Sequence, residues 1–126
     1  MVRFHHVNLA VPDDPSTDEE ARFLIDLIGY RRMDISPQLA AMGVRWYEAD
    51  DGSQVHLSVD PDHRPAAKAH VAVDFGDGLD ALEQRLLAAG VIYKAGEFDG
   101  TGILNCLDPA GNRWELRGRR AESVSS

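Results

Sequence analysis

The first half of the chain alternates between strand-like and helix-like patterns of apolar residues. Within residues 4–11, Val7, Leu9 and Val11 alternate with His6, Asn8 and Ala10, the period of two that is typical of a half-buried β-strand. After two prolines, Ser16 or Thr17 can begin a helix with acidic residues in its first turn and one apolar face, and Gly29 ends it. The elements expected next are a strand at 30–35, a loop with helical tendency at 36–43, and a hairpin of strands 44–49 and 54–59.

The same order of elements starts again at residue 70. HVNLAV at His6 and HVAVDF at His70 align with a shift of 64 residues, and Val55-His56-Leu57 aligns with Trp114-Glu115-Leu116. One copy of about 60 residues buries too little surface to be stable alone, so the repeat predicts an α+β fold of two βαβββ modules. The second copy is expected to contain strand 70–75, helix 79–89, and strands 91–94, 103–107 and 112–117. The expected division of this one fused domain is module 1–60, linker 61–69, module 70–118 and a disordered tail 119–126.

Composition and charge exclude several classes of partner. Lys plus Arg total 13 against 21 Asp plus Glu, a net charge of −8, which disfavours nucleic acid and anionic membranes as partners. No apolar run approaches the roughly 20 residues that cross a bilayer. Cys106 is the single cysteine, which rules out an intrachain disulfide and fits a cytoplasmic protein.

The strand periodicity also sorts the residues that can bind a metal. If the apolar faces of the strands pack on the helices, four candidates point to the opposite sheet faces at repeat-equivalent positions. A pseudo-twofold axis between the copies would bring all four to one cleft, where they suit Zn²⁺, Ni²⁺, Co²⁺, Mn²⁺ or Fe²⁺. The alternative is that each histidine is a hydrogen-bonded polar residue of its sheet. The four candidates are His6, His56, His70 and Glu115.

The segments HHVNLAV, VHL, HVAVDF and DPAGNRWEL resemble the signature strands of the vicinal-oxygen-chelate superfamily. This superfamily includes glyoxalase I, methylmalonyl-CoA epimerase, fosfomycin-resistance thiol transferases, extradiol dioxygenases and bleomycin-binding proteins. The resemblance spans about residues 3–118 and implies paired βαβββ modules that form an open, incomplete β-barrel around one metal ion. It implies His6, His70 and Glu115 as ligands and a homodimer. His56 stands where the family commonly has a fourth ligand, Glu or Gln.

The expected function is a glyoxalase-like lyase, isomerase or epimerase that uses one divalent metal and acts on a small oxygenated substrate. Glu115 or His56 would move the proton, and whether His56 is a ligand or a base stays open. The alternatives are a bleomycin-resistance-type binding protein without catalysis and a small extradiol-type dioxygenase. The residues expected to orient substrate are Asn8, Arg45, Tyr47, Asn105 and Arg117.

Overall fold

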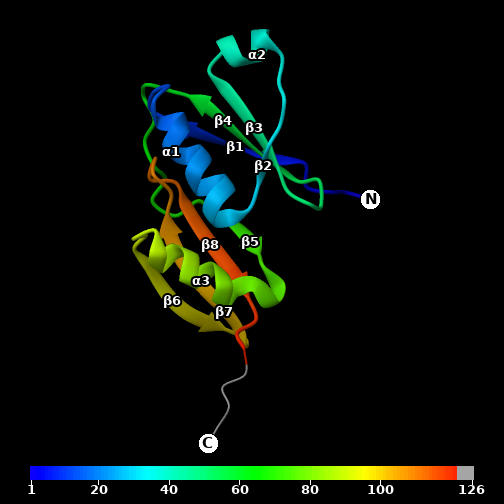
Figure 1. Cartoon of the computed structure of the whole chain (residues 1–126), viewed down its shortest axis with the longest axis vertical. Helices are drawn as coiled ribbons and strands as arrows, with labels where there is room; N and C mark the ends of the chain where they lie inside the picture. The colour runs from blue at the N-terminus through cyan, green and yellow to red at the C-terminus, as the bar shows by residue number, and fades with distance from the viewer. Residues whose placement is uncertain (122–126) are drawn as a thin grey trace, which may run out of the picture. The chain divides into compact units, whose positions relative to one another are not determined.

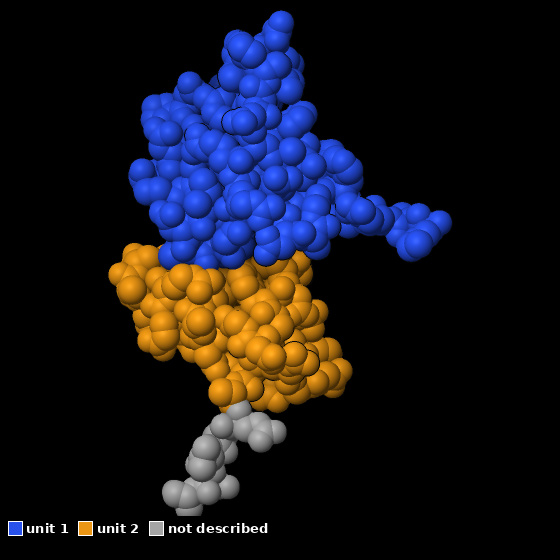
Figure 2. All heavy atoms as spheres, turned by 45° about the vertical axis from the view of Figure 1, so that its right-hand side comes forward, with its two compact units in different colours: residues 1–65, 109–112 blue, residues 66–108, 113–126 orange. Residues whose placement is uncertain are grey.

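The computed structural model describes residues 1–121, which form two compact units (Figure 2). Unit 1 comprises Met1–Pro65 together with the turn Pro109–Asn112. Unit 2 comprises Ala66–Asp108 together with the chain from Arg113 onward. Each unit contains one open, four-stranded sheet and a helical segment on one face of that sheet (Figure 1).

Unit 1 is the first βαβββ module. Its sheet has the strand order β1-β4-β3-β2, in which β1 is parallel to β4 and the other pairs are antiparallel. The helical segment ends at Gly29, whose φ of 109° only glycine adopts readily. The elements are β1 (His6–Val11), α1 (Ser16–Arg22), a π-helical segment η1 (Phe23–Ile28), β2 (Arg31–Arg32), α2 (Pro37–Ala41), β3 (Val44–Glu48) and β4 (Gln54–Val59).

Unit 2 repeats this topology with the strand order β5-β8-β7-β6, and β5 is parallel to β8. The α+β fold of two βαβββ modules, expected from the internal repeat, is therefore confirmed. The elements are β5 (His70–Asp74), a 3-10 turn η2 (Gly76–Gly78), α3 (Leu79–Ala88), β6 (Tyr93–Phe98), β7 (Thr101–Leu107) and β8 (Arg113–Gly118).

Each unit has its own apolar core between helix and sheet. In unit 2, Leu79, Leu82 and Leu86 of α3 are fully buried, at the helical spacing that places them on one face. They pack on the face of the sheet that carries Leu104, Trp114 and Leu116. In unit 1 the corresponding buried strand residues are Tyr47, Val55 and Leu57. The candidate ligands of the strands lie on the opposite face of each sheet.

The residues of the DPAGNRWEL segment make specific contacts in and around the turn Pro109–Asn112. Asp108 accepts a hydrogen bond from the Trp114 indole at 3.0 Å, which orients the first residues of β8. The Ala110 amide donates to the buried Glu20 carboxylate at 2.8 Å. Gly111 has a φ of 87°, and a Cβ at this position would lie 2.7 Å from Pro65. Only glycine fits there.

Three expectations differ from the structure in detail. The strand expected at 30–35 is reduced to Arg31–Arg32, because Ser36 is already the N-cap of α2 and accepts the Leu39 amide. The strand expected at 91–94 instead spans Tyr93–Phe98. The helix expected to run unbroken to Gly29 changes from α to π geometry at Phe23.

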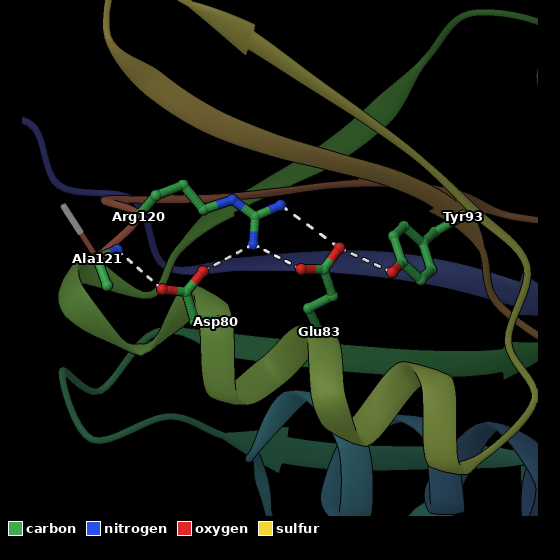
Figure 3. A network of polar contacts seen from close by, with 5 residues as sticks. All are labelled: Asp80, Glu83, Tyr93, Arg120 and Ala121. Atoms are coloured by element: carbon green, nitrogen blue, oxygen red, sulfur yellow. Dashed lines mark hydrogen bonds and ion pairs between the residues drawn. The ribbon is translucent and has the colours of Figure 1, made fainter. Parts of the chain in front are cut away.

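The chain beyond β8 contacts α3. Arg120 donates hydrogen bonds to Asp80 and Glu83 at 2.8 Å, and the Ala121 amide donates to Asp80 (Figure 3). Tyr93 donates to the same Glu83 carboxylate at 2.7 Å (Figure 3). Of the segment expected to be a disordered tail, residues 119–121 thus make defined contacts, and residues 122–126 lie outside the described residues. No helix within residues 1–121 is long and apolar enough to cross a membrane.

Candidate functional site

The two modules place their candidate ligands at equivalent positions of the sheets. In unit 1, His56 of β4 lies opposite Asn8 of β1, and His6 precedes Asn8 by two residues on the same face. In unit 2, Glu115 of β8 lies opposite Ala72 of β5, and His70 precedes Ala72 by two residues. The register of the first and last strands is therefore the same in both modules. All four candidates lie on the sheet faces turned away from the helices.

In unit 1 the imidazoles form a stack on the sheet. The rings of His6 and His56 lie 4.0 Å apart and nearly parallel, and the Trp46 ring stacks on the other face of His56 at 4.4 Å. His56 Nε2 lies 2.8 Å from Gln54 Oε1, so this nitrogen donates and Nδ1 keeps its lone pair. His6 Nδ1 lies 2.8 Å from His5 Nδ1, which leaves His6 Nε2 for another partner.

His56 is held in the neutral form. Burial, together with the nearby His6 and His5, lowers the pKa of His56 from its usual 6.5 to about 4. A neutral imidazole is the form of histidine that binds a metal ion. Protons therefore compete weakly for this side chain near neutral pH.

In unit 2, His70 is oriented as a metal-binding histidine would be. Its Nδ1 lies 2.9 Å from the Lys68 carbonyl oxygen, which can only accept, so Nδ1 carries the proton and Nε2 carries the lone pair. Nε2 lies 3.9 Å from Glu115 Oε1, too far for a hydrogen bond. Two atoms bound to one ion at about 2.0–2.2 Å lie roughly 3.0–3.5 Å apart. A shift of about half an ångström would bring this pair to that separation.

The structure thus brings the predicted ligands together in two pairs. Within each unit, the described residues hold no group of three or more His, Cys, Asp or Glu side chains placed to bind a metal ion. The chemistry of each pair fits a divalent ion of the first transition series, since imidazole and carboxylate are its usual ligands. Two ligands alone leave the coordination sphere incomplete.

Three of the five residues expected to orient substrate lie beside these pairs. Asn8 is the strand neighbour of His56 and accepts a hydrogen bond from Ser58 at 2.7 Å. Asn105 of β7 lies directly opposite Glu115. Arg117 Nε lies 3.7 Å from Glu115 Oε2.

The other two, Arg45 and Tyr47, are not brought to the pairs. Their strand partners are Leu57 and Val55, so both lie on the sheet face opposite to that of His56. Arg45 donates to the carbonyl oxygens of Val44 and Ala40. Tyr47 is fully buried, and burial raises its pKa.

Reasoning from the sequence missed Trp46, which lies opposite His56 in the hairpin. This side chain is only partly buried and stacks on the imidazole. The signal that could have found it is the turn between the two hairpin strands. With that turn centred on residue 51, positions 46 and 56 face each other.

Cys106 takes no part in either pair. It is buried in β7, and this burial raises the pKa of its thiol to about 11. The thiol is therefore protonated at neutral pH and is a poor nucleophile.

No protein-family model and no curated sequence matches the chain. Solved structures do match over nearly the whole length. A glyoxalase family protein from Bacillus anthracis is 26% identical with a TM-score of 0.81, covering 94% of this chain and 96% of that one. A glyoxalase/dioxygenase from Nostoc punctiforme is 20% identical with a TM-score of 0.76, covering 93% and 90%. A fosfomycin resistance protein from Listeria monocytogenes is 15% identical with a TM-score of 0.75, covering 98% and 96%.

Proposed function

This chain has the fold of the vicinal-oxygen-chelate superfamily, and from that premise we propose that it is a glyoxalase-like enzyme dependent on one divalent metal. The reaction is a lyase, isomerase or epimerase step on a small substrate with two neighbouring oxygens. His6 and His56 from unit 1 and His70 and Glu115 from unit 2 would bind the ion. We further propose that the protein is a homodimer.

The observation that carries this proposal is the equivalent placement of the two pairs. An isolated histidine on a sheet is explained by hydrogen bonding alone, but here a histidine of the first strand and a candidate ligand of the last strand recur in the same register. The tautomer of His70 supports the proposal, because its proton is fixed on the nitrogen that faces away from Glu115.

The bound ion would supply Lewis acidity that stabilises negative charge developing on the substrate oxygens. Burial and the neighbouring imidazoles hold His56 in the neutral form, which is the form of histidine that binds a metal ion. We therefore assign His56 to metal binding and the proton transfer to Glu115. Asn8 and Asn105, on the same sheet faces, would orient the substrate.

The test is metal analysis of the protein purified without an affinity tag and incubated with each candidate ion. We expect one ion per chain, and less than half of this for His6→Ala, His70→Ala and Glu115→Gln. His63→Ala is the matched control, since the His63 imidazole contacts the Ala110 carbonyl oxygen and belongs to neither pair. Fewer than about 0.1 ion per chain for the unmutated protein would contradict the proposal.

Turnover requires a second measurement. With the metal bound, the protein should catalyse exchange into D2O of the proton next to a carbonyl group, followed by NMR over a panel of small hydroxycarbonyl compounds. The Glu115→Gln variant should lose this exchange. Tight binding of an intact ligand without metal and without exchange would instead identify a binding protein.

A further inference from the structure

The face of the unit 2 sheet away from α3 carries a group of polar side chains around Glu115, beside the apolar Ile103 and Leu107. Along β8, alternate residues place Arg113, Glu115 and Arg117 on this face. Across the sheet, Glu115 lies opposite Asn105 of β7, and Asn105 lies opposite Lys94 of β6. Glu115 thus has donor side chains on its own strand and on β7, whereas its partner on β5 is Ala72.

This face differs in charge from the rest of the protein. With histidine neutral, three cations against two anions give it a net charge of 3 − 2 = +1, whereas the whole chain carries −8. A bound divalent ion would make the face still more positive. Such a local field favours an anionic ligand in an otherwise acidic protein. The charged residues of this face are Lys94, Arg113, Arg117, Asp74 and Glu115.

The Arg117 guanidinium is the donor best placed to use this field. Among residues 1–121, its polar side-chain contact is the 3.7 Å approach to Glu115, which is longer than a hydrogen bond. Its side chain is 38% exposed. The next two arginines differ, since Arg119 bonds Asp77 at 2.7 Å and Arg120 bonds Asp80 and Glu83 at 2.8 Å. The N–H groups of the planar Arg117 guanidinium therefore remain available to a ligand beside Glu115, a predicted metal ligand.

We propose that Arg117, assisted by Asn105 and Lys94, binds the carboxylate of a small 2-oxo- or 2-hydroxycarboxylate substrate. A guanidinium matches a carboxylate with two parallel hydrogen bonds. In such a substrate, a carboxylate oxygen and the oxygen on the adjacent carbon are the two neighbouring oxygens that the metal would chelate. This substrate class rests on the proposed function, but binding of the carboxylate by Arg117 can be tested without metal.

The metal-free test uses Glu115→Gln as the background. This change removes one metal ligand and also the carboxylate that competes for Arg117, while it keeps the shape of the side chain. Titration with pyruvate, followed by the 15N NMR signal of the Arg117 Nε–H group, should show saturable binding. In the double variant with Arg117→Gln, followed by backbone amides of β7 and β8, the affinity should fall roughly 10- to 100-fold.

Arg119→Gln on the same background is the matched control, because it removes an equal charge two residues away and should leave pyruvate binding unchanged. Arg117→Lys should restore only part of the affinity, since it keeps the charge but not the fork. Circular dichroism checks that each variant is folded. Equal pyruvate affinity with and without Arg117, or no saturable binding, would overturn the inference.

A second experiment separates this inference from the proposed function. The unmutated protein is loaded with Co²⁺, whose visible absorption reports its ligands, and pyruvate, inorganic phosphate and neutral hydroxyacetone are added in turn. We expect pyruvate to change the spectrum at the lowest concentration, and Arg117→Gln to raise that concentration at least about tenfold. Absence of Co²⁺ binding refutes the proposed metal site. Normal Co²⁺ binding with tighter binding of phosphate or hydroxyacetone refutes the carboxylate class.

Discussion

The low pKa of His56 makes the stability of the metal-free protein depend on pH in a predictable way. In the unfolded chain this imidazole takes up its proton near pH 6.5. In the folded protein it stays neutral down to about pH 4, because burial and the neighbouring His6 and His5 disfavour the charged form. Between these two values the unfolded state binds more protons than the folded state. The stability contribution is therefore present above pH 6.5 and is lost as the pH falls towards 4.

The magnitude follows from the distance between the two pKa values. Each pH unit corresponds to about 1.4 kcal/mol, so the interval from 6.5 to about 4 amounts to about 3 kcal/mol of unfolding free energy. This is a large fraction of the 5–15 kcal/mol typical of a small domain. The low pKa of His56 also favours metal binding, because a neutral imidazole does not have to release a proton before it binds the ion.

The assay is urea denaturation of protein dialysed against EDTA, at pH 7.5, 5.5 and 4, for the unmutated chain and for His56→Gln. Other groups titrate over this range, so the informative quantity is the difference in unfolding free energy between the two proteins. We expect that difference to shift by about 3 kcal/mol in favour of the variant between pH 7.5 and 4. Parallel pH profiles for the two proteins would refute the reasoning.

Two further predictions concern the stability of the fold. Gly111→Ala should lower the unfolding free energy by about 2–4 kcal/mol in urea denaturation, since it strains a φ of 87° and pushes a Cβ against Pro65. Gly96→Ala, which meets no atom within 4 Å, should change stability by less than about 0.5 kcal/mol, and a similar loss for both would argue against this explanation. Arg120→Gln removes the contacts to Asp80 and Glu83 and should cost about 0.5–1 kcal/mol at low salt. The cost should shrink in thermal melts at 1 M salt, and a salt-independent loss would show that packing rather than charge is responsible.

The sequence was sufficient to predict the repeat and the faces of four strands. His6 and His70 begin strands of strict period two, and His56 and Glu115 are each flanked by apolar residues that belong to the core. Side-chain direction in a strand follows from this alternation alone, so no long-range information was needed. The observed register then confirmed that the two copies are equivalent.

The face of β3 could not be read from alternation in the same way. Three successive residues of β3 each combine an apolar part with a polar group, so either face of the strand could face the core: Arg45, Trp46 and Tyr47. A shift of one residue in the register would exchange the two faces. The burial of Tyr47 in the core determines which face of β3 turns inward. Trp46 therefore lies on the other face, beside His56. The turn Pro109–Asn112 is likewise beyond local pattern, because its contacts to Glu20 and Ala10 join residues about ninety or more positions apart.

The electrostatic features of the site also depend on packing. The pKa of His56 is set by burial and by the imidazoles that the strands bring near it. The long contact from Arg117 to Glu115, close to the hydrogen-bonded Arg119, is known only once the side chains are placed. Sequence patterns predict which residues share one face of a strand. The pKa and the contacts of each side chain depend on its neighbours in the folded chain.

The central claim is that the pair His6 and His56 and the pair His70 and Glu115 bind the same ion. Anomalous diffraction at the zinc edge from crystals of the zinc-loaded protein tests it most directly. We predict one strong peak per chain, bonded to all three imidazoles and to the Glu115 carboxylate at about 2.0–2.2 Å. Separate peaks at the two pairs, or no peak at either, would contradict the account.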